Sequence, residues 1–255
     1  MDRLIFNSIR SVIEEDLSRQ RTVNELANVS TIGFKRSFDV AQRSIKIDGP
    51  GFDTRFQPQI LARDIVELAP GPLMVTGRPL DIAMQGDTVL AVQAPNGERA
   101  YTRRGDLRVN VNGVLETGSG HVVLGEQGPI NVPPGFSLRI NGDGTVFASN
   151  PAAAGAVAEQ PVGQLALRNA AAVSLSRRED GLYAVVGQPR GADIPVAAGA
   201  ALPAVTAQSL EGSNVTAVEA MARMMDHARS FEMQVRIIKE TKSIDESGTS
   251  LMRLG

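Results

Sequence analysis

Apolar residues recur every three or four positions over the first 30 residues of the chain. This segment contains no glycine or proline, and charged residues such as Arg10, Glu14 and Arg19 fall on the opposite side of a helical projection. The spacing predicts an amphipathic helix that ends before Gly33. Its apolar positions are Leu4, Ile5, Ile9, Val12, Ile13, Leu17, Val23, Leu26 and Ala27.

A second helical pattern lies near the end of the chain, where residues 217–247 also contain no glycine or proline. Ser213 or Asn214 can cap its start. Its apolar residues alternate in steps of four and three, which is a heptad repeat. These residues are Ala217, Met221, Met224, Ala228, Phe231, Val235 and Ile238. Lys242 interrupts the series, and the stripe continues one residue earlier, as at a discontinuity in a coiled coil. The continuation comprises Ile237, Thr241, Ile244, Gly248 and Leu251.

The middle of the chain consists of short strand-like runs separated by turn signals. The runs cover residues 88–93, 107–111, 121–124, 136–140 and 182–186. Asn-Gly pairs at 96–97, 112–113 and 141–142 tolerate the positive φ of tight hairpin turns. Regular strand spacing with such turns predicts an antiparallel sheet.

These patterns together predict an α+β fold. Long N- and C-terminal helices are expected to form a coiled-coil-like stem that carries an inserted, mainly antiparallel β domain. The alternative is that the C-terminal helix lies on its own β domain. The expected domains are a discontinuous helical domain of residues 1–36 and 210–255, an extended linker region of residues 37–76, and a β-rich outer domain of residues 77–209.

Composition excludes several classes of function. Lys and Arg total 26 and Asp and Glu total 28, so the formal charge is −2 and there is no polybasic footprint for nucleic acid. Cysteine is absent, which removes disulfides and thiolate chemistry. No apolar run approaches the ~20 residues of a membrane helix. Acidic residues at 14–16 come too early for a secretory leader, so we expect no cleaved signal peptide.

The search for chemistry assigns no catalytic, metal or cofactor residue. His121 and His227 have no second ligand at metal-binding spacing. Asn141 could begin a calcium loop, but its twelfth position is Ala152 rather than Glu. There is also no nucleophile elbow, P-loop or dinucleotide-binding motif.

Two weaker features remain as alternatives. Acid pairs could line a hydrolytic cleft, and a basic cluster next to Tyr101 could contact a partner. The acid pairs are Asp64 with Glu67 and Glu179 with Asp180, and the basic cluster is Arg103-Arg104.

One block near the N-terminus is distinctive: Asn24-Glu-Leu-Ala-Asn-Val-Ser-Thr-Ile-Gly-Phe-Lys-Arg36. It resembles the N-terminal signature of the bacterial flagellar rod and hook proteins, in which Asn-Leu-Ala-Asn precedes Thr-x-Gly-Phe-Lys. Glu25 stands where the family has Asn, and Ile32 stands where it often has Pro or Thr. The matching motif residues are Asn24, Leu26, Ala27, Asn28, Gly33, Phe34 and Lys35.

Further blocks follow in the family's order, so the resemblance spans most of the chain. The compact connection at 37–75 and the Asp180-Gly-Leu-Tyr183 block look more like the proximal than the distal rod proteins. The distal rod protein remains the alternative within the family. The other matching blocks are Thr76–Gly86, Tyr101–Leu107, Asn112–Leu115, Val123–Ile130, Leu210–Val215 and Arg229–Glu232.

The resemblance implies a structural subunit of the flagellar basal-body rod rather than an enzyme, with no cofactor. It implies export through the flagellar type III apparatus without a cleaved signal, followed by assembly into the drive shaft that crosses the periplasm. The implied partners are other rod subunits, further copies of the chain and the export apparatus, with no nucleic acid or small-molecule substrate. The terminal helices would form the inner layer around the export channel.

The residues expected to form the helical assembly contacts are apolar positions of both helices: Leu4, Ile5, Ile9, Val12, Ile13, Leu17, Met221, Met224, Phe231, Val235 and Ile238. Two readings from other classes stay open. One is a periplasmic envelope-binding or hydrolytic domain whose helices merely dimerise. The other is a phage-tail-like or adhesin stalk.

Overall fold

The computed structural model describes residues 2–38, 42–46, 56–60, 64–150, 159–195 and 202–253. The chain divides into two compact units. Unit 1 comprises residues 1–28, 39–62 and 215–255, and unit 2 comprises residues 29–38 and 63–214. Each unit is therefore built from segments that are far apart in the sequence.

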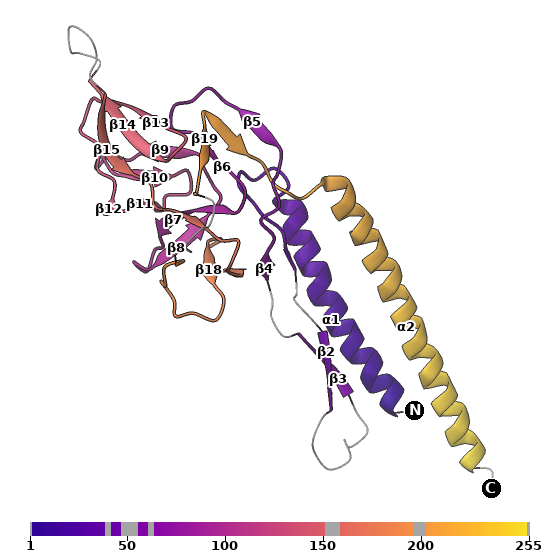
Figure 1. The fold of residues 1–255 in the computed structure, drawn as a ribbon. Helices are drawn as coiled ribbons and strands as arrows, with labels where there is room; N and C mark the ends of the chain where they lie inside the picture. Colours follow the sequence, from indigo (N-terminus) through magenta and orange to yellow (C-terminus); the bar gives the residue numbers. More distant parts are fainter. Residues whose placement is uncertain are drawn as a thin grey trace. The chain divides into compact units, whose positions relative to one another are not determined.

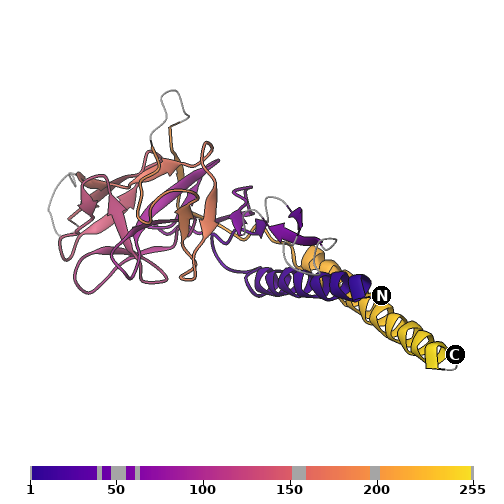
Figure 2. The same ribbon diagram turned by 90° about the horizontal axis from the view of Figure 1, so that it is seen from below.

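Unit 1 contains two helices, α1 (Asp2–Ala27) and α2 (Ala217–Arg253), which lie side by side (Figures 1 and 2). Glu25 of α1 pairs with Arg223, whereas Glu15 contacts His227 further along α2, so the two helices are antiparallel. The strands β2 (Gln42–Lys46) and β3 (Phe56–Ile60) form a hairpin, and β3 contacts α1. Within the described residues, neither helix has the length and continuous apolar character needed to cross a membrane.

Polar residues lie on the faces that the two helices turn toward each other. Thr22 and Glu25 of α1 are buried, and Thr241 of α2 is buried. The apolar residues Met224, Val235 and Ile238 of α2 are half-buried. Four α2 positions repeat every seven residues, of which Ala220 and Thr241 are buried and His227 and Gln234 are half-buried. This repeat lies one residue N-terminal to the predicted apolar seam, and one residue rotates a helix by about 100°.

The predicted coiled-coil-like stem is therefore wrong. Met221 and Phe231, which the seam placed between helices, are 54% and 51% exposed. The predicted α+β fold class is also wrong, and the structure consists mostly of antiparallel sheet. The described residues contain two helices and twenty strands, and every strand pair is antiparallel. The periodicity marked helical segments, but apolar residues cover more of α2 than one antiparallel neighbour can bury, so the pattern did not identify the face that meets α1.

Unit 2 is a set of antiparallel sheets, the largest of which has eleven strands. Its main path runs β1 (Ser37–Phe38), β4 (Ile65–Val66), β17 (Leu175–Arg177), β18 (Tyr183–Val185), β8 (Arg99–Thr102), β7 (Thr88–Gln93), β11 (Val122–Gly125), β10 (Leu115–Thr117) and β9 (Leu107–Val109). Two strands branch from this path: β12 (Gly128–Pro129) pairs with β11, and β16 (Leu167–Asn169) pairs with β7.

Three smaller sheets complete unit 2. One joins β13 (Ser137–Ile140), β14 (Thr145–Ser149) and β15 (Gln160–Gln164). The other two pair β19 (Val205–Ala207) with β6 (Ile82–Met84) and β20 (Ser209–Glu211) with β5 (Leu73–Val75).

The three Asn-Gly pairs lie where the sequence predicts hairpins. Asn96-Gly97 joins β7 to β8, Asn112-Gly113 joins β9 to β10, and the turn that starts at Asn141 joins β13 to β14. Turn chemistry is local, and it therefore predicts these pairings correctly from sequence alone.

Strand β7 separates two apolar cores in unit 2. Leu90 and Val92 point into one core, and Val89 and Ala91 point into the other, as expected from the two-residue period of a strand. All four residues are fully buried. Because both faces are covered, residues 89–92 of β7 form an unbroken run of apolar side chains.

Candidate functional site: a buried charge cluster where separate sequence blocks meet

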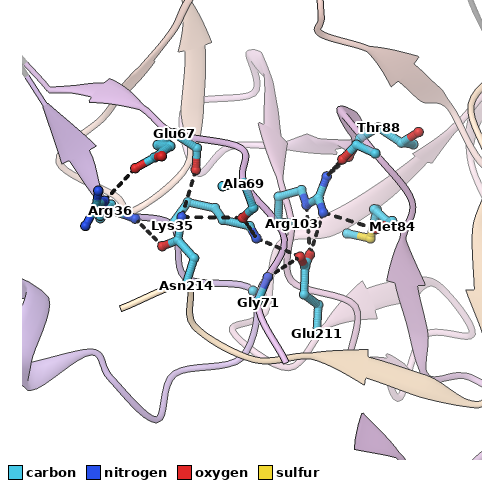
Figure 3. A network of polar contacts seen from close by, with 12 residues as sticks. Lys35, Arg36, Glu67, Ala69, Gly71, Met84, Thr88, Arg103, Glu211 and Asn214 are labelled. Atoms are coloured by element: carbon cyan, nitrogen blue, oxygen red, sulfur yellow. Dashed lines mark hydrogen bonds and ion pairs between the residues drawn. The ribbon is translucent and has the colours of Figure 1, made fainter. Parts of the chain in front are cut away.

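Three charged side chains meet inside unit 2, and each comes from a different block of the sequence (Figure 3). Lys35 lies in the segment that leads from α1 into unit 2, Arg103 follows β8, and Glu211 ends β20. The side chains of Lys35 and Arg103 have no exposed surface, and that of Glu211 is 4% exposed. We refer to these three residues as the buried charge cluster.

The carboxylate of Glu211 organises the cluster. Its Oε1 accepts a hydrogen bond from Nζ of Lys35 at 2.6 Å and one from the amide of Gly71 at 3.0 Å. Its Oε2 accepts from Nε and Nη2 of Arg103 at 2.9 and 2.7 Å. Each oxygen therefore accepts two hydrogen bonds, which is what a fully buried carboxylate needs to offset its lost hydration.

Arg103 uses all five of its N–H donors. Besides the two bonds to Glu211, its Nη1 donates to the carbonyls of Gly86 and Thr88, and its Nη2 donates to the carbonyl of Met84 at 3.1 Å. The guanidinium thus fixes the turn between β6 and β7 as well as β20. A planar fork of five donors makes this arrangement possible, and lysine could not reproduce it.

Lys35 is a buried cation whose charge is affected by burial. Burial lowers the pKa of its ammonium, and this effect is opposed by the hydrogen bond and charge of Glu211. Its Nζ also donates to the carbonyl of Ala69 at 2.7 Å. Two cations share one carboxylate, so removing Glu211 would leave both buried without a counter-ion.

A second layer of polar contacts surrounds the cluster. Nε of Arg36 lies 2.5 Å from Oε2 of Glu67, and the amide of Arg36 donates to Oδ1 of Asn214 at 2.7 Å. Nδ2 of Asn214 donates to the carbonyl of Glu67 at 3.0 Å. These bonds tie the segment before β1 to the segment that follows β20 (Figure 3).

Gly33 can be no other residue without a shift of the backbone. Its φ is +67°, a conformation that residues with a Cβ rarely adopt, and an added Cβ would lie 2.3 Å from the carbonyl oxygen of Arg103. Its amide donates to the carbonyl of Glu211 at 2.8 Å. Next to it, the ring of Phe34 stacks under the guanidinium of Arg177 at 4.2 Å.

The family-motif residues divide between the two units. Asn24, Leu26, Ala27 and Asn28 belong to unit 1, where Nδ2 of Asn28 donates to the carbonyl of Asn24 at 2.8 Å at the end of α1. Gly33, Phe34 and Lys35 belong to unit 2, where Lys35 is part of the cluster and the amide of Gly33 donates to the carbonyl of Glu211.

The predicted helical assembly residues are at most partly covered where their side chains are described. Ile13, Met221 and Phe231 are exposed, whereas the others are half-buried. The half-buried residues are Val12, Leu17, Met224, Val235 and Ile238. The side chains of Leu4, Ile5 and Ile9 lie outside the part of the chain that the structure describes.

Three of the residues that the sequence offered as candidates for catalysis or metal binding lie beside charged partners. Glu67 pairs with Arg36, Asp180 pairs with Arg178, and His227 contacts Glu15. Among the described residues, no three His, Cys, Asp or Glu side chains gather as a metal site would require.

In the basic cluster Arg103-Arg104, the side chain of Arg103 is buried, whereas that of Arg104 is 31% exposed and pairs with Asp106. Sequence reasoning missed the buried charge cluster for a clear reason. Glu211 lies 108 positions from Arg103 and 176 from Lys35, and nothing local links them. The available signal was that three of the blocks that carry the family resemblance each contain one member of the cluster. Those blocks end at Lys35-Arg36, begin at Tyr101 and begin at Leu210.

Two family models match the chain in regions that hold two of the three cluster residues. One, described as "Flagellar basal body rod FlgEFG protein C-terminal", matches residues 206–251, which include Glu211 and most of α2. The other, described as "Flagellar hook protein FlgE/F/G D1 domain", matches residues 83–148, which include Arg103.

Whole-chain comparisons find curated relatives of nearly equal length. The chain is 39% identical to the "Flagellar basal-body rod protein FlgF" of Salmonella typhimurium over 97% of this chain and 96% of the relative. It is 37% identical to the Escherichia coli protein of the same name, with the same coverage. The "Flagellar basal-body rod protein FlgG" of Buchnera aphidicola (subsp. Schizaphis graminum) is 31% identical over 91% of this chain and 90% of the relative.

Proposed function

The chain belongs to the family of flagellar basal-body rod proteins and is a structural subunit of the proximal rod, and we propose that it polymerises through its two terminal helices. It is located in the flagellar basal body and assembles with other rod components. The proposal assigns the shaft-forming contacts to apolar surface of α1 and α2. We further propose that the assembled subunit transmits torque and that its two helices lie around the export channel.

The distribution of apolar residues on α2 carries this proposal. Beside the polar face that meets α1, one flank carries Met224, Phe231 and Val235. The other flank carries Met233, Ile237 and Ile244, which are 63%, 41% and 53% exposed. A soluble monomer has little reason to keep apolar side chains on both sides of a polar seam, whereas a subunit with neighbours on both sides buries them.

The energetics favour association through these flanks. Fully burying one large apolar side chain is worth ~1.5–3 kcal/mol, so completing the burial of a half-exposed one is worth roughly 1 kcal/mol. The exposed large apolar residues of α2 also include Met221 and Met225. Two different flanks that fit each other make a heterologous contact, which propagates instead of closing into a dimer.

The polar seam between α1 and α2 has a complementary role in this proposal. Ion pairs and hydrogen bonds with fixed geometry set which helix face meets which, because a wrong register leaves buried charges unpaired. One such pair is Glu25, which is 3% exposed, with Arg223, whose Nη1 donates to Oε2 of Glu25 at 2.9 Å. The seam keeps the two helices of one subunit in register, and the apolar flanks stay available for neighbours.

Two finer parts of the function follow from family membership alone. We propose export through the flagellar type III apparatus without a cleaved signal, as the family resemblance implies. The relatives are named as flagellar basal-body rod proteins, and we propose that this chain has no catalytic role. The acid pairs 64/67 and 179/180 are the residues that a hydrolytic function would have needed.

The test is to replace one residue on each flank of α2 and to measure recovery of the chain in purified basal bodies. Phe231→Ala and Met233→Ala are both expected to lower the amount of chain recovered with rods. Arg229→Ala, an exposed change on the same helix, is the matched control and is expected to match the wild type. Equal recovery of all three variants would overturn the proposed role of the flanks.

A further inference from the structure

Strand β5 is an apolar strand at an open sheet edge in unit 2. Leu73, Met74 and Val75 are 55%, 45% and 82% exposed. On one side, β5 pairs with β20, whose three residues are buried. Within the described residues, no strand pairs with its other side.

The hydrogen bonds around β5 show which backbone groups face outward. The carbonyl of Pro72 accepts from the amide of Gly212 at 2.8 Å, and the amide of Thr76 donates to the carbonyl of Gln208 at 2.9 Å. Bonding toward β20 therefore falls on the even-numbered residues. In an antiparallel strand the alternate residues point their N–H and C=O groups to the opposite edge, so those of Leu73 and Val75 face away from β20.

This edge has no charged protection against pairing. Exposed edge strands are normally kept very short, or are shielded by charged side chains, prolines, bulges or a covering segment. β5 carries three apolar side chains and no charge, and only the prolines at 70, 72 and 79 limit how far a pairing could extend. Exposed apolar side chains and outward backbone groups on the same three residues are the features by which a sheet edge accepts an added strand.

The size of the edge identifies the kind of partner. Three residues cover far less than the ~800 Å² per partner of a stable interface, so β5 alone cannot hold a freely diffusing protein. It can hold a segment that other contacts already keep at high local concentration. In a polymer of this chain, a neighbouring copy meets that condition. Only five residues, 212–216, separate β20 from α2, which is at most about 20 Å of extended chain.

We propose that β5 is a second assembly contact, at which an extended segment of a second copy of this chain adds to the open sheet edge. The inference rests on the proposed polymerisation through the helices, because those contacts bring the second copy within reach. It assigns α2 and β5 different tasks. The helix flanks supply most of the buried apolar area, and the strand edge fixes the rotation of one β unit relative to the next by directional hydrogen bonds.

The absence of cysteine makes a clean crosslinking test possible. A single cysteine at Val75, labelled with a maleimide-benzophenone probe, is photolysed in assembled rods. A single cysteine at Val111 is the control, because that residue is 101% exposed at the turn between β9 and β10 and lies in the same unit. The expected result is a product of twice the 27.1 kDa chain mass from Val75→Cys and none from Val111→Cys.

Substitution at the same positions provides the second readout. Val75→Lys is expected to lower recovery of the chain in rods by at least about tenfold, which corresponds to ~1.4 kcal/mol. Val111→Lys is expected to leave recovery unchanged. Both purified variants are expected to melt at the wild-type temperature, because both side chains are exposed.

The outcomes separate this inference from the proposed function. A crosslink from Val75 to a different rod protein, or wild-type recovery of Val75→Lys, would overturn the inference and leave the rod assignment in place. Absence of the wild-type chain from rods would overturn both.

Discussion

At the scale of single residues, Glu211 has the largest structural consequence. It is the only carboxylate that bonds both buried cations, Lys35 and Arg103, among the contacts of the described residues. Glu211→Gln keeps the shape of the side chain but removes its charge, and it leaves the two cations without a counter-ion. The expected loss of unfolding free energy is about 3–5 kcal/mol, measured by urea denaturation at neutral pH.

The matched control for this prediction is Glu159→Gln. Glu159 pairs with Arg139, but both side chains are exposed, at 41% and 47%. Exposed ion pairs contribute ~0–1 kcal/mol, so this variant is expected to be close to the wild type. Equal stability of the two variants would contradict the structural role of the cluster.

Asp193 gives unit 2 a defined response to acid. Burial raises the pKa of its carboxyl, but hydrogen bonds from Arg168, Tyr101 and Arg99 outweigh this and lower the pKa to about 2. The lowered pKa means that the carboxylate stabilises the fold at all pH values above its ordinary range near 4. That contribution is lost as the pH falls from about 4 toward 2.

The measurement is the melting temperature as a function of pH for the wild type and for Asp193→Asn. The variant is expected to be less stable at pH 7 and to lose less stability than the wild type between pH 4 and pH 2. Asp87→Asn, a change at an exposed position, is expected to follow the wild-type curve. A variant curve parallel to the wild type over this range would contradict the assignment.

At the scale of elements, local sequence patterns predicted where a turn or helix lies better than they predicted which face of a helix packs against its neighbour. Gly97, Gly113 and Gly144 adopt the positive φ that glycine permits, and the turns that contain them join the expected strands. The facing sides of α1 and α2 did not follow from the heptad, because a heptad marks an apolar surface without saying which protein covers it. Here the facing sides include the buried polar residues Thr22, Glu25 and Thr241, which a count of apolar positions could not identify.

The polar seam leads to a prediction for the helix pair. Glu25→Gln removes the buried charge that binds Arg223, so the contact between α1 and α2 is expected to weaken by about 1–3 kcal/mol. Thermal unfolding of the full chain, followed by circular dichroism at the helix band, is expected to show the helices melting earlier.

Arg223 also binds Glu219, which is 49% exposed and lies on its own helix. Glu219→Gln is the control, and it is expected to change helix melting by only a few tenths of a kcal/mol. If both variants melt alike, the seam does not set the pairing of the helices.

At the scale of the whole molecule, the same residues hold together segments of unit 2 that lie far apart in the sequence. The cluster joins the segment that follows α1 to the segment that precedes α2, and both bond to the β6–β7 turn through Arg103. The family resemblance could be recognised from the sequence because these blocks are distinctive. Their convergence on Glu211 could not be recognised, because it depends on pairings across more than 100 positions.

The most direct test is electron microscopy of basal bodies from cells that lack this gene. The account predicts no completed rod and no swimming in those cells. It further predicts that the full chain restores both and that a chain without residues 1–30 restores neither. Complete rods and normal swimming in the deletion strain would contradict the central claim that this chain is a structural subunit of the rod.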